Sequence, residues 1–201
     1  TLPQFLDDLE HGRPQPVYTT DEHPDLSETP IPLWSLIRLK DYAVVPVQYS
    51  RGCPFNCEFC DIIVMYGRKP RTKTPEQLIR EIQALYDAGW RSGVFIVDDN
   101  FIGNKRNVKQ MLPHLIRWQR EHNVPFNLLT EASADLADDE QLMRMMAQAN
   151  FRKVFLGIET PDPDGLRECG KHQNASRDMT EVVATIHRHG MQVMGGFIVG
   201  F

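Results

Sequence analysis

The sequence has 201 residues, 41% of them hydrophobic and 24% charged, and this predicts one ordinary globular domain with enough chain for a core. Its formal net charge of −5 argues against a broad nucleic-acid-binding surface. No apolar stretch approaches the length of a transmembrane segment, and no signal peptide is visible. Clustered cysteines without a disulfide pattern favour a reducing compartment, the cytoplasm.

Residues 1–42 are rich in Pro, Asp and Glu and weakly periodic, which predicts a linker or N-terminal extension rather than a folded unit. Residues 43–201 make up the predicted core domain. The chain stops at Phe201 within an expected strand, so we expect the core to be incomplete and to continue past this residue.

The first half of the core alternates strand and helix patterns. Residues 43–49 predict a strand, and Pro46 favours an edge position for it. A helix follows from residue 75, because Thr74 suits the N-cap and Gln77 the capping-box position; Gly89 ends it. Residues 93–97 predict a buried parallel strand that is apolar on both faces.

The alternation continues to the end of the chain. We expect helices at 105–121 and 139–148, strands at 125–130 and 153–158, then a helix capped by Ser176 and ended by Gly190, and a strand at 192–199. This order predicts an α/β fold with βαβ units and a parallel sheet. An open doubly wound sheet and part of a β/α barrel both fit it.

Three cysteines within eight residues carry the main chemical signal. Cys53, Cys57 and Cys60 have the spacing C-x3-C-x2-C, and no fourth cysteine lies nearby. Three thiolates on one loop suit a 4Fe–4S cluster that keeps one iron without a protein ligand, whereas electron-transfer clusters normally use four cysteines. This arrangement indicates a metal centre whose open iron binds another molecule.

A structural zinc site is the alternative for this motif. Zinc takes four ligands, commonly from two short pairs of cysteine or histidine. The next cysteine is Cys169, and no histidine lies between His23 and His114. A zinc site, or a four-ligand electron-transfer module that is not an enzyme, therefore requires a distant fourth ligand such as Cys169.

Polar residues follow each later strand of the predicted sheet. Asp98, Asp99 and Asn100 come after the second strand, Glu131 and Ser133 after the third, and Glu159 after the fourth. Ligands bind beyond the carboxyl ends of parallel strands, so these side chains and the cysteine loop predict one site. The alternative is structural: the first three cap a turn, and the glutamates pair with arginines of neighbouring loops.

Residues 67–73 form the one basic run, Gly-Arg-Lys-Pro-Arg-Thr-Lys. A solvated loop that leads into the next helix is the interpretation we favour. A contact for an anionic substrate or for an electron-donor protein is the alternative.

The run from Arg51 to Cys60 resembles the signature loop of the radical S-adenosylmethionine (radical SAM) superfamily, including the aromatic Phe59 before the last cysteine. Residues 61–74, 97–104 and 157–161 are similar to the cobalamin-binding branch of that superfamily, which includes hopanoid C-2 methylase-like proteins. The resemblance spans most of residues 43–201.

The resemblance implies a partial (β/α)6 barrel of which about five βα units are present. It implies a 4Fe–4S cluster that reductively cleaves S-adenosylmethionine (SAM) to a 5′-deoxyadenosyl radical, and cobalamin bound through a domain outside this chain. The expected reaction is methylation of an unactivated carbon of a small-molecule or lipid-like substrate, with an electron donor such as a flavodoxin or ferredoxin. Radical cyclisation, rearrangement or sulfur insertion are the alternatives within the superfamily.

The resemblance also implies contacts to SAM. Residues 98–100 occupy the place that receives the amino group, without the frequent Gly-Gly-Glu sequence, and Glu159 matches a position that reaches the ribose or methionyl part. Phe59 is expected to contact the adenine through its backbone. The remaining expected cofactor-binding residues are Glu131, Ser133, Gly196, Ile198 and Gly200, the last three beside the adenine, and no residue is assigned a catalytic role.

Overall fold

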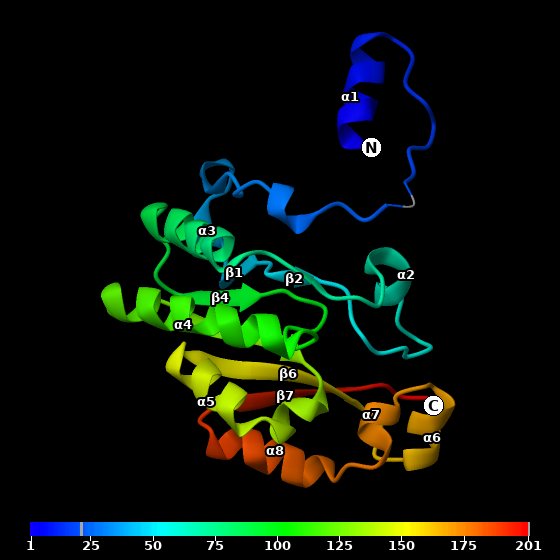
Figure 1. The fold of residues 1–201 in the computed structure, drawn as a ribbon, viewed down its shortest axis with the longest axis vertical. Helices are drawn as coiled ribbons and strands as arrows, with labels where there is room; N and C mark the ends of the chain where they lie inside the picture. Colours follow the sequence, from blue (N-terminus) through cyan, green and yellow to red (C-terminus); the bar gives the residue numbers. More distant parts are fainter. Residues whose placement is uncertain (21, 201) are drawn as a thin grey trace.

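The computed structural model describes residues 1–20 and 22–200, and its centre is a five-stranded parallel sheet (Figure 1). The strand order is β1-β4-β5-β6-β7, so β1, which contains Pro46, lies at an edge as predicted. The strands are β1 (Val44–Val47), β4 (Gly93–Ile96), β5 (Asn127–Ala132), β6 (Phe151–Glu159) and β7 (Gln192–Phe197). The α/β class and the parallel sheet are confirmed.

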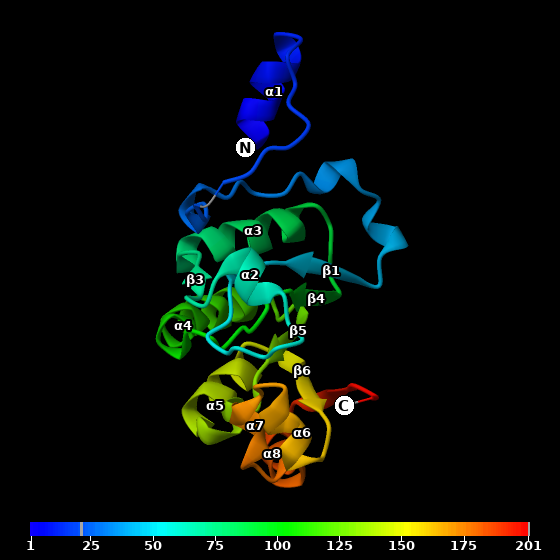
Figure 2. The same ribbon diagram turned by 90° about the vertical axis from the view of Figure 1, so that its right-hand side faces the viewer.

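Four helices cover one face of this sheet (Figure 2). They are α3 (Pro75–Asp87), α4 (Lys105–Glu121), α5 (Glu140–Gln148) and α8 (Met179–Arg188). Alternate strand residues such as Val45, Val94 and Leu156 are fully buried against them. The intervening residues are only half-buried or exposed, so the β4 strand is not buried on both faces as expected. A sheet covered on one face is consistent with a partial barrel.

Local signals explain where the helices begin. Thr74 and Gln77 form the predicted capping box of α3, and the Asn104 side chain accepts a hydrogen bond from the Asn107 N–H at the start of α4. The prediction for α8 was wrong at its start, because its N-cap is Asp178 rather than Ser176. Asp178 accepts two backbone N–H bonds in the first turn, which a serine two residues earlier does not reach.

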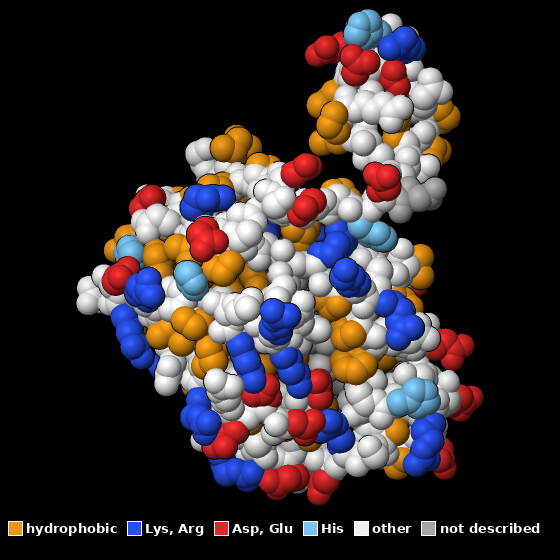
Figure 3. Space-filling view, in the orientation of Figure 1, with side chains coloured by type: hydrophobic (Ala, Val, Ile, Leu, Met, Phe, Trp, Pro, Cys, Tyr) orange, Lys and Arg blue, Asp and Glu red, His pale blue; other side chains and the backbone are white. Residues whose placement is uncertain are grey.

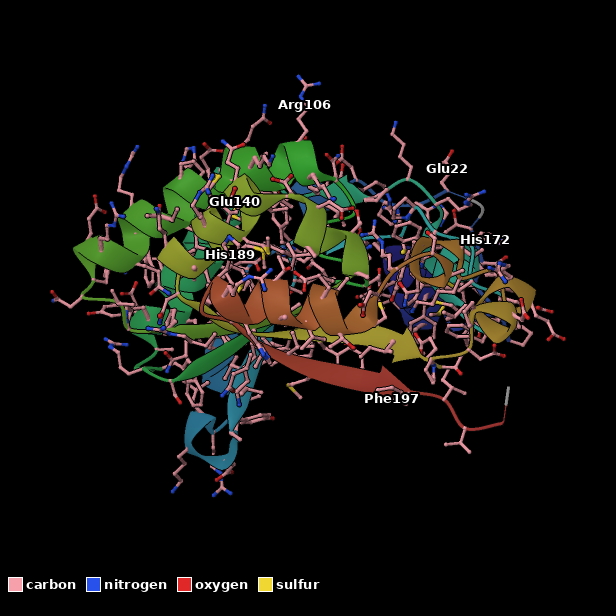
Figure 4. The ribbon with its side chains drawn as sticks, turned by 90° about the horizontal axis from the view of Figure 1, so that it is seen from below. Glu22, Arg106, Glu140, His172, His189 and Phe197 are labelled. Atoms are coloured by element: carbon pink, nitrogen blue, oxygen red, sulfur yellow. The ribbon has the colours of Figure 1, made fainter. Side chains whose placement is uncertain are left out.

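Helices α5 and α8 also contact each other through their side chains. Figure 4 views the molecule from below, with α8 and α5 on the same side of β7. There the imidazole of His189, which follows α8, lies 4.0 Å from the Glu140 carboxylate of α5. This contact joins two consecutive units of the helical layer.

Residues before the sheet contain short helices, namely α1 (Leu2–Glu10) and the 3-10 turns Leu26–Glu28, Trp34–Leu36 and Leu39–Asp41. Helix α1 lies apart from the sheet and buries none of its side chains (Figures 1 and 2). Its Leu2, Leu6 and Leu9 are between 49% and 64% exposed, and apolar side chains are visible on this part of the surface (Figure 3). No helix within the described residues is long and apolar enough to cross a bilayer.

Six short elements that the sequence did not predict gather at the carboxyl ends of the strands. They are β2 (Ser50–Arg51), α2 (Ile62–Tyr66), β3 (Arg71–Thr72), the 3-10 turn η4 (Ala134–Asp138), α6 (Pro163–Glu168) and α7 (His172–Ala175). Part of the basic run is therefore strand, and its last residue, Lys73, is 5% exposed and paired with Glu81. The expectation of a solvated loop over residues 67–73 was wrong there.

Candidate functional site

The three cysteines lie on one loop that crosses the carboxyl edge of the sheet. Cys53 follows β2, and Cys57 and Cys60 precede α2; all three are half-buried free thiols. The backbone turns at Gly52, where φ is 100° and an added Cβ would lie 2.9 Å from the Gly67 carbonyl oxygen. Only glycine fits this turn, which brings the cysteine loop against the loop after α2.

The three cysteines of this loop line one cavity of ≈ 160 Å³. It lies where the carboxyl ends of β4, β5 and β6 meet the cysteines, as the strand-end pattern predicted. Besides the three cysteines its lining residues are Phe55, Phe59, Asp99, Asn100, Glu131, Ala132, Ser133, Phe155, Gly157, Glu159, Lys171 and Gln173. Most of the polar residues expected at the site are thus brought together.

Asp98 is an exception, because its carboxylate points away from this cavity. It is 1% exposed, and its two oxygens accept hydrogen bonds from the Tyr49 N–H and the Ser50 hydroxyl, each at 2.7 Å. Burial raises the pKa of Asp98 to about 7, although these hydrogen bonds oppose the rise. The structure therefore gives Asp98 an anchoring role: it fixes the chain that enters the cysteine loop and is not placed to contact SAM.

Asp99 and Asn100 face the cysteine loop directly. The Asp99 carboxylate accepts the Gly52 N–H at 2.8 Å, and the Asn100 amide lies 3.9 Å from the Cys53 sulfur and 3.1 Å from the Ser133 hydroxyl oxygen. The Asn100 Oδ1 is buried without a hydrogen-bond partner within the protein. A buried acceptor without a partner is costly, so this oxygen is suited to a hydrogen-bond donor on a bound group.

Glu131 contributes an acidic side chain from the end of β5. Burial raises its pKa, and the neighbouring charge of Asp99 raises it further. Two carboxylates on one cavity wall repel each other unless a cation lies between them. The pair therefore makes this wall suited to a positively charged group.

Glu159 ends β6 in a left-handed conformation with φ of 67°, which is uncommon for a residue with a side chain. Its carboxylate pairs with the Lys171 ammonium, and the side chains are 9% and 12% exposed. A Cβ on Gly157 would overlap both partners, so the ion pair lies directly over glycine backbone. The partner of Glu159 is a lysine, not the arginine that the structural alternative expected.

Phe59 lines the cavity with 42% of its surface exposed. The Lys171 ammonium lies 5.7 Å from the centre of its ring, within range of a cation–π contact. Phe59 thus connects the cysteine loop to the ion pair at the end of β6.

The three residues expected beside the adenine, Gly196, Ile198 and Gly200, do not line this cavity. An added Cβ on Gly196 would lie 2.6 Å from the Phe155 ring, so its glycine makes room for a side chain of β6. Ile198 lies past the end of β7, and its N–H donates to the Glu159 carbonyl at 2.9 Å. Gly200 has an open surrounding, and an added Cβ there would meet nothing within 4 Å.

The segment between β6 and α8 forms one wall of the cavity, which the sequence did not predict. The Cys169 carbonyl accepts the Glu58 N–H at 2.8 Å, and an added Cβ on Gly170 would lie 2.8 Å from the Asn56 carbonyl oxygen. Further along, the Gln173 amide donates to the Cys57 sulfur at 3.5 Å. These contacts join residues about one hundred positions apart, so spacing in the sequence carries no signal for them.

Burial raises the thiol pKa of Cys53 and Cys57, while hydrogen bonds from Asn100 and Gln173 respectively oppose the rise. Cys169 is buried and its sulfur lies 3.5 Å from the Leu166 carbonyl oxygen. Within the described residues, no group of three or more His, Cys, Asp or Glu converges as ligands of a single ion. The donor set, three thiols on one cavity wall with nearby amide donors, is compatible with a multi-iron cluster.

A family model for the radical SAM superfamily matches residues 47–201. The chain belongs to this superfamily. Over 201 residues it is 54% identical to an uncharacterized methyltransferase of Synechocystis sp., covering all of this chain and 38% of that protein. It is 41% identical over 199 residues to a hopanoid C-2 methylase of Rhodopseudomonas palustris, covering 99% of this chain and 38% of that protein. The chain thus spans well under half the length of these relatives.

Solved structures show the same fold. The cobalamin-dependent SAM radical enzyme OxsB, with aqua-cobalamin and SAM bound, gives a TM-score of 0.77 at 18% identity, covering 98% of this chain and 32% of that one. The radical SAM methyltransferase TsrM from Kitasatospora setae, with cobalamin and a 4Fe–4S cluster bound, gives 0.67 at 16% identity, covering 79% and 31%. These similarities confirm the predicted partial barrel; no closed barrel is formed by the described residues.

Proposed function

We propose that this chain is the radical SAM core of a methyltransferase. In this proposal Cys53, Cys57 and Cys60 hold a 4Fe–4S cluster, whose chemistry when bound is to deliver one electron to SAM. The observation that carries the proposal is the cavity shared by three cysteine thiols and the polar ends of three strands. The names of the two relatives described above support methyl transfer.

The charges around the cavity fit the methionyl end of SAM. Asp99 and Glu131 form an acidic wall suited to its ammonium, and Lys171 supplies a cation suited to its carboxylate. Asn100, whose Oδ1 lacks a hydrogen-bond donor, lies beside the Cys53 sulfur. Phe59 and the half-buried Phe155 present apolar surface for the adenine, and Glu159 lies within reach of the ribose in this proposal.

The whole protein is proposed to use cobalamin and to methylate an unactivated carbon of a small or lipid-like molecule. Support comes from structures of similar fold that contain cobalamin and from the hopanoid C-2 methylase among the relatives. A flavodoxin or ferredoxin is the proposed electron donor, and the cytoplasm the proposed location. Because the cobalamin would be held outside residues 1–201, this part of the proposal concerns the full-length protein.

The test uses full-length protein prepared anaerobically with iron, sulfide and a reductant. We expect 5′-deoxyadenosine to form from SAM, and a methyl label from SAM to reach a product when cobalamin is added. Formation of 5′-deoxyadenosine without methyl transfer would favour cyclisation, rearrangement or sulfur insertion instead.

Two cysteine variants separate the three-ligand proposal from a site with four protein ligands. Cys57→Ala should lose iron and SAM cleavage, whereas Cys169→Ala should keep both. Loss of iron in Cys169→Ala, or tetrahedral zinc in the wild-type protein, would refute the proposed cluster.

A further inference from the structure

Gln173 is a polar residue of the cavity whose amide points at a cysteine sulfur. It lies in α7, and its Nε2 donates to the Cys57 Sγ at 3.5 Å. The proposed function uses Cys57 as a ligand but assigns nothing to Gln173. A hydrogen bond to a ligand sulfur is one of the few ways in which a protein adjusts an iron–sulfur cluster.

Neighbouring contacts fix the backbone that carries this amide. The Gln173 carbonyl accepts the Arg177 Nε–H at 2.8 Å, and the Arg177 guanidinium binds the Asp138 carboxylate through two contacts of 2.7 and 2.6 Å. The next residue, Asn174, is 1% exposed and donates to the Gly157 carbonyl at 2.9 Å. The segment is thus anchored to η4 and to β6, which fixes the backbone from which the Gln173 side chain extends.

The three cysteines differ in what reaches their sulfur atoms. The Cys53 sulfur accepts from the Phe55 backbone N–H and, at the longer distance of 3.9 Å, from the Asn100 amide, which also donates to Ser133. Among the described residues, no side-chain hydrogen bond to the Cys60 sulfur is present. Gln173 therefore makes the shortest side-chain hydrogen bond to any of the three sulfurs.

We propose that Gln173 is a positioning residue that donates a hydrogen bond to the Cys57 thiolate of the bound cluster and raises the reduction potential of that cluster. Reduction adds negative charge to the cluster and its sulfurs, so an N–H donor stabilises the reduced state more than the oxidised one. This inference rests on the proposed function, because it requires the cluster to be bound at these cysteines. The effect acts on the electron supply and not on the contacts to SAM.

The experiment compares substitutions of Gln173 in anaerobically prepared full-length protein. Gln173→Met keeps the length of the side chain but lacks the N–H, and Gln173→Glu adds a negative charge. Gln173→His retains an N–H donor and serves as the conservative rescue. Gln148→Met, on α5 and in a different surface hollow, is the matched control.

The readout is the midpoint potential of the cluster, from a redox titration followed by electron paramagnetic resonance. At the wild-type midpoint, Gln173→Met should lower the ratio of reduced to oxidised cluster about tenfold, which is ~59 mV for a one-electron couple. Gln173→Glu should lower it further, and Gln173→His and Gln148→Met should leave it near the wild-type value. A wild-type potential in Gln173→Met overturns the inference, and so does loss of the cluster from every Gln173 variant.

The same preparations separate this inference from the function on which it rests. A shifted potential without any 5′-deoxyadenosine from the wild-type protein would support the role of Gln173 and refute the proposed reaction. Normal SAM cleavage together with an unshifted potential in Gln173→Met would leave the proposed function intact and refute the role of Gln173. A wild-type protein that binds no 4Fe–4S cluster would refute both.

Discussion

The buried carboxylate of Asp98 should make the folded protein less stable as pH rises, whereas most carboxylates have the opposite effect. Burial raises its pKa from 3.8 to about 7, so the folded state holds a proton that the unfolded state releases. Between these two values the native protein binds more protons than the unfolded chain, and stability therefore falls as pH rises. Well above the folded-state pKa, from about pH 8, the carboxylate is charged in both states and the loss is complete.

The size of the effect follows from the same two values. Each pKa unit corresponds to ~1.4 kcal/mol, so ionisation of Asp98 costs the folded state up to ~4 kcal/mol between pH 4 and pH 8. Asp98→Asn removes this cost. Its carbonyl can still accept the Tyr49 N–H, and the Ser50 hydroxyl can accept from its amide, because a hydroxyl both donates and accepts.

Urea unfolding of the wild-type protein and Asp98→Asn at a series of pH values measures this cost. The free energy of unfolding of the variant relative to wild type should rise with pH by up to ~4 kcal/mol and level off above about pH 8. Asp87→Asn, at an exposed carboxylate in the last turn of α3, is the control substitution. A difference between Asp98→Asn and wild type that stays constant from pH 4 to pH 8 would refute the reasoning.

Two further experiments test the segment after β6, each with its own control substitution. Gly170→Ala should reduce iron content on reconstitution, because the new Cβ would lie 2.8 Å from the Asn56 carbonyl oxygen. Gly190 has a similar positive φ, but an added Cβ would meet nothing within 4 Å. Gly190→Ala should therefore lower stability and leave the iron content unchanged. Lys171→Met should lower the free energy of unfolding by ~3 kcal/mol because it leaves the Glu159 carboxylate buried and unpaired. Adding Glu159→Gln should restore most of the loss, and equal stability of the single and double variants would contradict this account.

The sequence predicted those elements whose signals are local. The capping box of Thr74 and Gln77 set the start of α3, and Pro46 indicated an edge strand. Helix α4 was predicted with its observed bounds, and it continues through Pro113. Such signals lie within a few residues of the feature they determine, so a single sequence is sufficient to detect them.

The short elements around the cysteines could not be predicted in the same way. Helices α2, α6 and α7 have four to six residues each, too few for a periodic apolar face. Non-local contacts hold them, such as the hydrogen bond from the Glu58 N–H to the Cys169 carbonyl. The polar residues after the strands predicted a site at this edge of the sheet, but they could not show which carboxylate faces the cavity.

Asp98 and Asp99 illustrate why the residues of the site were harder to assign than its place. Both are acidic and adjacent, and both follow the same strand. Both lie past the end of β4 and Asp99 is already in a turn, so the alternation of side chains along the strand does not determine where either points. Asp98 turns to the backbone of Tyr49 beneath the loop, and Asp99 lines the cavity while binding Gly52. A pattern of acidic residues after strands therefore predicts where a site lies. Only the structure shows which of these residues anchors the backbone and which lines the cavity.

The conformation of Glu159 explains how the unpredicted wall reaches the cysteines. A left-handed turn by a residue with a side chain costs ~1 kcal/mol or more, so surrounding contacts must compensate for it. Here the Ile198 N–H binds the Glu159 carbonyl, and the side chain pairs with Lys171. The turn ends β6 and directs the chain into α6 and α7, which brings Gln173 to Cys57. The same ion pair that lines the cavity therefore also stabilises the turn that places a hydrogen-bond donor on the cysteine loop.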